Sequence, residues 1–411
     1  MGFDARELTP LLVTRSAIAV AQTRAFKKAA IVMADVAGQP VSAKTLERVA
    51  GDVGLELAQR RDADPKTDAA LAQRPELAPA LAVVECDGGR IRTRQPDHGP
   101  GVHLEGKGWN ETKNACLIRA TRKMFAEDPQ PDPPECFCNP EHVAKIAETE
   151  ALSVASPAAR EQTVAEDDAP EPLLPPADWR PKRLVRTVLA SMACSKDFGK
   201  QMAREAKRRR FGQAKAKAFL GDGLPWNWSI WKRHFSDYTP ILDFIHALSY
   251  LFAAAKAVHD DAQDVWNQYL VWMRGCWRGE IDQILEELDV WQTKLGPPPD
   301  DAPDNDPRKV LAKSFNYLTN NRERMNYPDY RKAGLPVTTA WMESLVKEIN
   351  WRVKGTEMFW NNPEGAEAIL QIRAAALSDD DRLKTHLQNR PGYPFTRRPK
   401  PAKLTPEKNK S

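Results

Sequence analysis

The chain has 411 residues, of which 42% are hydrophobic, and its formal net charge is +4. That length gives room for a sizeable core and for two or three substructures. No apolar run approaches the roughly 18 residues that a membrane span needs, and the acidic start does not fit a secretory signal. Six scattered cysteines in so long a chain favour reduced thiols, so we expect a cytoplasmic protein without a membrane partner.

The charge is unevenly distributed along the chain. Residues 121–180 hold five basic and thirteen acidic residues, whereas residues 182–217 hold twelve basic and two acidic residues. The last twenty-one residues carry six basic residues against one acidic residue, which predicts a basic, disordered tail over 391–411. Such local surpluses favour a polyanion such as nucleic acid, although a solvated helix face gives the same pattern.

The first 78 residues are predicted to form an N-terminal helical region. Residues 9–36 are rich in alanine, a break follows at Gly38, and Ser42 can cap a second helix that reaches about Arg60. Two helices joined by a short turn have the outline of a DNA-reading helix-turn-helix. Any two packed helices of a bundle share that outline, so both interpretations stay open.

A tight hairpin is predicted next in the chain. The run 81–86 has the character of a buried strand, Asp87-Gly88-Gly89 interrupts it, and the alternating residues 90–94 predict a second strand. Asp87 would then stand at the end of the first strand. A third strand is expected over 112–120.

Residues 128–180 are rich in Pro, Ala, Glu and Asp, which predicts a flexible excursion whose middle, 143–151, can form a helix. Within it Cys136, Cys138 and His142 suggest zinc, but they form an incomplete ligand set. Residues 184–192 then predict a returning strand or a buried helix, and residues 196–212 predict a basic helix. That helix contributes three consecutive candidate phosphate ligands, Arg208, Arg209 and Arg210.

A short apolar strand, 218–220, ends at Gly221-Asp222-Gly223. Glycine on both sides lets the backbone turn sharply and leaves the carboxylate of Asp222 at a strand end, where a metal-binding aspartate is wanted. An ordinary Asp-Gly turn is the alternative. Trp226 and Trp228 follow, and each is suited either to stacking on an unpaired base or to core packing.

Beyond this turn the chain is predicted to be largely helical. A short strand over 240–246 enters a helix over 247–258, a core stripe at helical spacing covers 260–291, and a further helix covers 308–324. Thr338 or Thr339 caps a last helix over 340–354. Its polar stripe consists of Glu343, Lys347, Asn350 and Lys354, in which Glu343 can face a cleft or form a surface ion pair.

Three carboxylates therefore stand on separate elements, in the order strand-Asp87, strand-Asp222 and helix-Glu343. That order is the layout of an RNase H-like nuclease core. Two divalent cations about 4 Å apart can clamp the attacking and leaving oxygens of a phosphoryl displacement, and Mg²⁺ or Mn²⁺ prefers carboxylate oxygens. We expect an α/β (α+β) fold: an RNase H-like mixed sheet flanked by helices, an all-helical insertion and the N-terminal helical region.

The chain resembles bacterial insertion-sequence transposases of the DDE type, the group allied to Mutator-like elements. The resemblance runs in order from about residue 10 to residue 395. It is carried by the segments Val84–Arg94, Gly221–Trp228, Ile241–His246, Gly334–Ser344 and Arg352–Trp360.

The resemblance implies that Asp87, Asp222 and Glu343 are catalytic and hold two Mg²⁺ or Mn²⁺ ions. It also implies that Asp243 and His246 form a D-x-x-H pair, in which His246 contacts DNA or the two form a hydrogen bond within the core. The enzyme would cleave double-stranded DNA at transposon ends and join the ends to target DNA, as a homo-oligomer at a bacterial nucleoid, without a small-molecule substrate. Arg208–Arg210, Lys347 and Lys354 would contact phosphates.

The implied core consists of residues 79–246 and 334–390, with the excursion inside the first part and a helical insertion over 247–333. The chain departs from the family in three ways. Thr338-Thr339 stand where relatives often have glycines, no cysteine-rich region precedes the helices, and the acidic excursion is long. The alternative function is therefore that of an inactive, truncated or repurposed transposase that only binds DNA.

Overall fold

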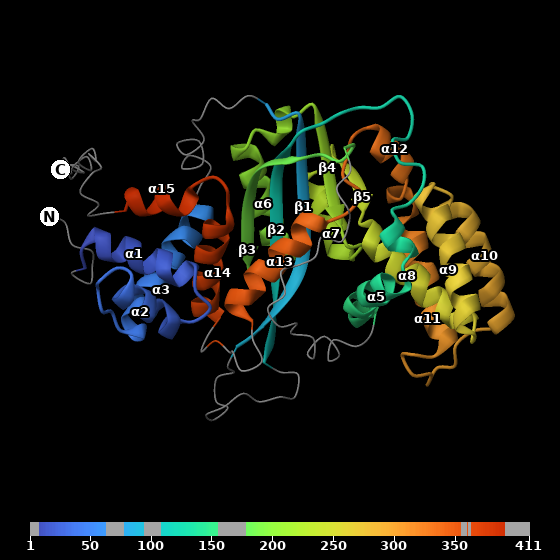
Figure 1. Ribbon diagram of the computed structural model, residues 1–411, viewed down its shortest axis with the longest axis horizontal. Helices are drawn as coiled ribbons and strands as arrows, with labels where there is room; N and C mark the ends of the chain where they lie inside the picture. Colours follow the sequence, from blue (N-terminus) through green and yellow to red (C-terminus); the bar gives the residue numbers. More distant parts are fainter. Residues whose placement is uncertain are drawn as a thin grey trace, which may run out of the picture.

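The computed structural model of the chain describes residues 8–62, 78–93, 108–154, 178–354, 360 and 363–390. Figure 1 shows a sheet in the middle, with one group of helices on either side of it. The first group contains helices from both ends of the chain, and the second contains α5 (Pro140–Val154) and the helices α8 to α12, within 244–332. Among the described helices, none combines the length and the apolar character that crossing a membrane requires.

The sheet has five strands in the order β3-β2-β1-β4-β5. They are β1 (Leu81–Arg92), β2 (Trp109–Ala120), β3 (Arg183–Ser191), β4 (Ala216–Gly221) and β5 (Thr239–Leu242). The first three strands pair antiparallel, whereas β4 pairs parallel with both β1 and β5. The predicted α/β class with a mixed sheet flanked by helices is therefore confirmed.

The predicted hairpin around Asp87 is wrong, because β1 continues through Asp87 and pairs with β2 to its end. Asp87 lies opposite Asn114 and Gly89 lies opposite Thr112. A Cβ atom on Gly89 would lie 2.7 Å from Oγ1 of Thr112. This glycine therefore permits a close approach of two strands rather than a turn, which is the other common reason for glycine in a strand.

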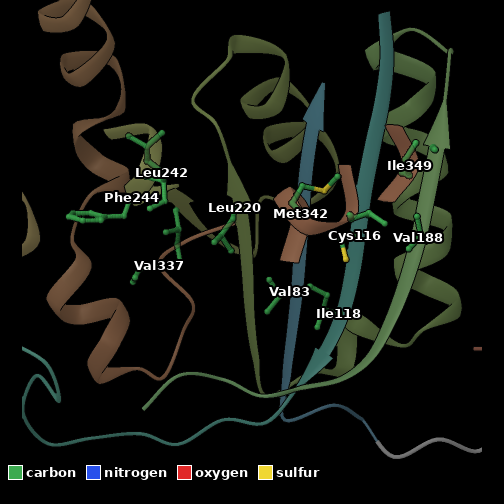
Figure 2. Close-up of a cluster of buried hydrophobic side chains, with 14 of the residues drawn as sticks. Val83, Cys116, Ile118, Val188, Leu220, Leu242, Phe244, Val337, Met342 and Ile349 are labelled. Carbon is green, nitrogen blue, oxygen red and sulfur yellow. The ribbon is translucent and has the colours of Figure 1, made fainter. Parts of the chain in front are cut away.

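The two faces of the sheet have separate cores, because successive side chains of a strand point in opposite directions. On one face Val83 and Leu220 pack in the cluster that contains Met342 and Ile349 of α13 (Ala340–Val353) (Figure 2). On the other face strand residues such as Val84 pack with side chains of two helices. These are α6 (Ser195–Arg208) and α7 (Pro225–His234), and the short helix η3 (Phe211–Gln213) lies between α6 and β4.

The helix-prone N-terminal segment contains two helices, α1 (Pro10–Ala21) and α2 (Phe26–Asp35), and α3 (Ala43–Asp62) follows. They pack with two helices from the end of the chain, α14 (Pro363–Leu377) and α15 (Arg382–Gln388) (Figure 1). A Cβ atom on Gly54 would lie 2.1 Å from the carbonyl oxygen of Ala368, so α3 and α14 touch backbone to backbone. Buried Arg373 donates to the Ala21 carbonyl at 2.9 Å. The two ends of the chain therefore form one bundle.

The segment predicted to be an insertion, residues 247–333, consists mainly of helices, and we call it the insertion below. It contains α8 (Phe244–Val258), α9 (Ala262–Trp277), α10 (Ile281–Leu295), α11 (Pro307–Asn321), η4 (Arg322–Arg324) and α12 (Tyr327–Lys332). The stripe predicted over 260–291 is divided between α9 and α10, because Gly279 takes φ +81° and turns the chain.

The first part of the excursion that we expected to be flexible is packed. It contains η1 (Glu135–Cys138) and α5 (Pro140–Val154). Phe137 is buried, and its ring centroid lies 5.4 Å from that of Phe244 in the insertion. Asp128 accepts a hydrogen bond of 2.8 Å from fully buried Arg331. Residues 155–177 of the excursion lie outside the described residues, as do residues 391–411.

Candidate active site

Asp87 and Asp222 follow residues that are direct neighbours in the sheet. Cys86 of β1 pairs with Gly221 of β4, and this is the last pair of the parallel ladder. Asp87 and Asp222 therefore leave the ladder at the same level, where β4 ends and β1 continues. Asp87 is half-buried, and Asp222 is only 8% exposed.

Asp222 is held by hydrogen bonds on its own turn. Its Oδ1 accepts from the Leu224 amide at 2.9 Å and from the side-chain amide of Asn227. Asn227 is fully buried, and its Oδ1 in turn accepts from the Cys86 thiol at 3.4 Å. Asp222 therefore forms an Asx turn just before α7. This is the ordinary Asp-Gly turn that the sequence offered as the alternative.

Tyr317 of the insertion fixes the same turn from the other side. Its hydroxyl donates to the Asp222 carbonyl at 2.6 Å. Gly223 takes φ +89°, and a Cβ atom there would lie 2.6 Å from the Tyr317 hydroxyl oxygen. The Tyr317 ring stacks on Tyr250 with centroids 3.6 Å apart. Tyr317 therefore ties the turn that contains Asp222 to α11, and through its stacking on Tyr250 to α8.

Glu343 lies in the first turn of α13 and is half-buried. The helix packs on β1 and β2, on the core face that also carries Val83 and Leu220. A carboxylate in a first helical turn is favoured by the helix dipole. Glu343 therefore stands at the start of a helix that packs on the sheet, whereas Lys347, one turn later, is exposed.

Glu85 is the acidic residue that sequence reasoning missed. It lies on β1 two residues before Asp87, so the two side chains share one face of the strand. Glu85 is 0% exposed, and neither carboxylate oxygen has a hydrogen-bond partner among the described residues. Its signal in the sequence was an acidic residue inside an otherwise apolar strand.

The pKa of Glu85 is raised well above its usual range, first by burial and then by the negative charges of Asp243 and Glu343. The backbone amide of Met342 acts in the opposite direction, but it does not reach hydrogen-bonding geometry with either oxygen. Burial and the two negative charges therefore both favour the neutral form of Glu85.

Asn114 adds a second buried polar side chain beside Asp87. It lies opposite Asp87 on β2 and is 1% exposed. Within the described part of the chain, neither its amide nitrogen nor its amide oxygen has a hydrogen-bond partner. Buried polar atoms without partners are rare in folded proteins and are typical of sites that receive a ligand or change protonation.

Asp243 and His246 form the hydrogen bond within the core that was one of the two alternatives. Asp243 is fully buried and caps α8; its Oδ2 lies 2.6 Å from His246 Nδ1. Its Oδ1 accepts from the Thr339 amide at 2.8 Å, next to the start of α13. Asp243 thus joins the start of α8 to the start of the helix that carries Glu343.

Both tryptophans near Asp222 are packed against protein groups. Trp228 donates from Nε1 to Asn321 at 2.8 Å, and the guanidinium of Arg324 lies 4.5 Å from its ring centroid. The ring of Trp226 lies 5.5 Å from the Lys113 ammonium. Both rings are partly buried and pack against the hydrophobic cluster on this face of the sheet, and base stacking stays a prediction.

The predicted phosphate ligands are separated in space. Arg208 and Arg209 donate to Glu205 at 3.1 and 3.2 Å and line a cavity beside β3, at the sheet edge opposite β5. Arg210 is exposed beside them. Lys354 at the end of α13 lies 5.7 Å from the ring centroid of Trp109. The structure does not bring Arg208–Arg210 to the carboxylates.

Among the residues that the structure describes, no group of three or more His, Cys, Asp or Glu side chains is placed to hold a metal ion. This holds for Asp87, Asp222 and Glu343, and also for the residues at which zinc was considered. Oδ1 of Asp87 accepts a hydrogen bond of 2.6 Å from the Gly88 amide, and Oδ1 of Asp222 accepts from Leu224 and Asn227. The carboxylates, as arranged, do not fit a metal.

Comparison of the chain with protein-family models and with curated proteins found no match.

Proposed function

We propose that the chain is a DNA transposase of the DDE type, which cleaves DNA at the ends of an insertion sequence and joins those ends to target DNA. One observation carries the proposal. Asp87 and Asp222 follow paired residues on two adjacent parallel strands, and Glu343 starts a helix packed on the same sheet. This strand, strand and helix order on a mixed five-stranded sheet supports an RNase H-like core.

The surroundings of the three carboxylates suit a site that handles phosphate oxygens. Asp243 and Tyr317 hold the elements that carry Glu343 and Asp222. Glu85 in its neutral form keeps one negative charge out of a site that already contains several. It can also donate a hydrogen bond, which an ionised carboxylate cannot do.

The resemblance implies two Mg²⁺ or Mn²⁺ ions at Asp87, Asp222 and Glu343, whereas the described arrangement does not fit a metal. Nicking of DNA from the flanks of the coding sequence should therefore be measured with Mg²⁺, with Mn²⁺ and with a chelator. Asp222→Asn keeps an oxygen that can accept from the Leu224 amide, so it removes charge without removing the turn. We expect it to lower nicking about a thousandfold or more.

The matched control is Asp237→Asn, since Asp237 is an exposed acid that pairs with Lys217. Its nicking rate should match that of the unsubstituted protein. Equal nicking by Asp222→Asn and the unsubstituted protein would dismiss the assignment.

The second candidate function is that of a DNA-binding protein derived from a transposase. The lack of a metal-ready carboxylate group among the described residues favours it. In that case the unsubstituted protein binds duplex DNA, with an affinity that falls steeply as salt is raised, but does not nick it under any of the three conditions.

A further inference from the structure

The exposed apolar side chains of the protein are concentrated in the N-terminal helices. Twelve large hydrophobic side chains are exposed in the described part of the chain, and six of them lie within residues 8–62. The six are Leu11 and Ile18 on α1, Ile31 and Val32 on α2, Val36 just after α2, and Leu55 on α3. Single exposed apolar residues are ordinary, whereas several on one substructure are typical of an interaction surface.

The helix α2 carries the centre of this apolar surface. It packs on α1 and α3 at the side of the bundle away from the sheet (Figure 1). Its buried residues, Ala29 and Met33, lie one turn apart. On its outer side Ile31 and Val32 are 52% and 38% exposed. The helix therefore has an apolar strip in the middle of the face that it turns away from its own bundle.

The outer face of α2 continues onto α1. Arg15, an exposed residue of α1, donates to the Ala37 carbonyl beyond the end of α2 at 3.4 Å. Leu11 and Ile18 lie one turn before and one turn after Arg15, and both are exposed. Val36 precedes Ala37 and is 81% exposed. The apolar surface therefore covers two helices.

The charges of α2 are placed against its own helix dipole. Lys27 and Lys28 lie in the first turn and Asp35 is the last residue, whereas a helix favours acids at its start and bases at its end. The N-cap residue, Ala25, has no side chain that can accept from the first amides. Among the described residues, neither lysine forms an ion pair, and nor does Asp35. All three are exposed, so a partner can reach them.

We propose that the outer face of α2 is the interface of a symmetric dimer, in which two copies of this chain pack their α2 helices antiparallel. Lys27 and Asp35 lie four residues before and four residues after Ile31, on the same face of the helix. A two-fold axis at Ile31 therefore places the lysines of each copy beside the aspartate of the other. Each aspartate then lies at the uncapped helix start of the other copy, and the lysines at its helix end, so both dipoles are complemented.

A second copy fits this face better than an unrelated partner, because the face is complementary to itself. Its apolar residues lie in the middle and its opposite charges at the two ends, so a reversed copy matches apolar with apolar and base with acid. An anionic surface, such as a membrane or a nucleic acid, would attract the lysines but repel Asp35. The inference does not rest on the proposed transposase function.

The first test is the association of the full chain in solution. Sedimentation velocity over a range of protein concentrations should show an equilibrium between monomer and dimer. Ile31→Glu puts two like charges at the two-fold axis and should weaken the dimer at least about a hundredfold.

Val290→Glu is the matched control, because Val290 is 68% exposed but lies on α10, in the insertion. It makes the same kind of change and should leave the dimer intact. A chain that stays monomeric up to about 100 µM would overturn the inference and leave the face to a different partner. A dimer that Ile31→Glu leaves intact would also overturn it, since the copies would then meet elsewhere.

An exchange of charges tests the antiparallel arrangement. Asp35→Lys puts bases beside bases at both ends of the interface, and the double substitution Lys27→Glu with Lys28→Glu puts acids beside acids. Each protein alone should dimerise at least about tenfold more weakly. When the two are mixed in equal amounts, every base faces an acid again, and a heterodimer of about the original affinity should form.

The same variants separate loss of the dimer from loss of the fold. Each substitution agrees better with the helix dipole than the original residue does, so the Tm of the dilute proteins should not fall. Two folded variants that fail to associate on mixing would overturn the antiparallel interface. None of these measurements uses DNA or a metal ion, so their outcome is independent of DNA cleavage.

Discussion

Glu85 and Glu205 are both buried glutamates, but their surroundings are opposite. Glu205 accepts hydrogen bonds from three arginines, and although burial alone would raise its pKa, Arg382, Arg209 and Arg208 lower it to about 2. Glu85 has no hydrogen-bond partner among the described residues, and burial raises its pKa well above the ordinary value. The arginines therefore favour the ionised form of Glu205, whereas the surroundings of Glu85, beside the candidate active site, favour its neutral form.

The contrast shows that burial alone does not determine what a carboxylate does. The arginines that bind Glu205 come from the end of α6 and from α15, so this carboxylate joins two elements of the fold. Around Glu85 the charged neighbours are other acids, Asp243 and Glu343, so they act with burial to favour its protonated form.

The largest effect is expected for Glu205→Gln. The change leaves Arg208, Arg209 and Arg382 without their shared anion in a largely buried position, which should lower the free energy of unfolding by about 3–5 kcal/mol. Urea unfolding measures it. Asp197→Asn, on the same helix but exposed, is the control and should stay within about 0.5 kcal/mol. A small loss for Glu205→Gln would mean that the arginines do not depend on this acid.

Acid should reproduce part of that loss in the unsubstituted protein. The folded-state pKa of Glu205 lies below its ordinary value of 4.5, so its contribution is complete above that pH and is lost as the pH falls toward about 2. The full contribution is about 3 kcal/mol. Urea unfolding from pH 6 to pH 3 should show the decline, and Glu205→Gln should show a shallower one. Parallel pH profiles for the two proteins would contradict the assignment.

Gly223→Ala tests how the candidate active site is held together, since that region depends on backbone fit rather than on ion pairs. The positive φ of Gly223 and its contact with Tyr317 make a side chain costly there, so stability should fall by about 2 kcal/mol. Gly212→Ala is the control, because a Cβ atom there meets open space and the backbone is unstrained. Equal stability of the two variants would show that the Asp222 turn is free to move.

The smallest effect is expected for Glu85→Gln, although it is the same substitution as in Glu205. At about pH 4, where Glu85 is protonated in the unfolded chain as well as in the folded one, the change should alter stability by less than about 1 kcal/mol. A raised folded-state pKa gives stability that is complete at low pH and is lost as the pH rises through that pKa. The variant should therefore become more stable than the unsubstituted protein at alkaline pH, as measured by urea unfolding at pH 9. A large loss at pH 7 would show that Glu85 is ionised and paired.

Much of the fold could be predicted because local patterns agree with it. The strands β2, β3 and β4 and the helix α13 lie close to their predicted ranges, since each has a continuous apolar run or stripe that also faces the core. The hairpin at Asp87 failed because two adjacent glycines fit a turn and a close strand contact equally well. Only the pairing of Gly89 with Thr112 decides between them.

The site was harder to predict, because it depends on partners distant in the sequence. Asp87 and Asp222 were proposed from predicted strand ends, of which only the one before Asp222 is present, and the bond from Tyr317 to Asp222 crosses 95 residues. Arg209 was expected to face DNA, whereas it pairs with Asp380 across the bundle. A run of arginines does not show which acids will fold onto it.

The contact between Gly54 and Ala368 has a consequence for how the chain is made. The two residues are separated by roughly 300 positions, so at a typical rate of synthesis α3 leaves the ribosome tens of seconds before α14 exists. During that time the apolar face of α3 that will meet α14 has no partner from its own chain. The N-terminal helices are the first to be synthesised and the last to reach their final packing, and nascent-chain chaperones would have most to protect there.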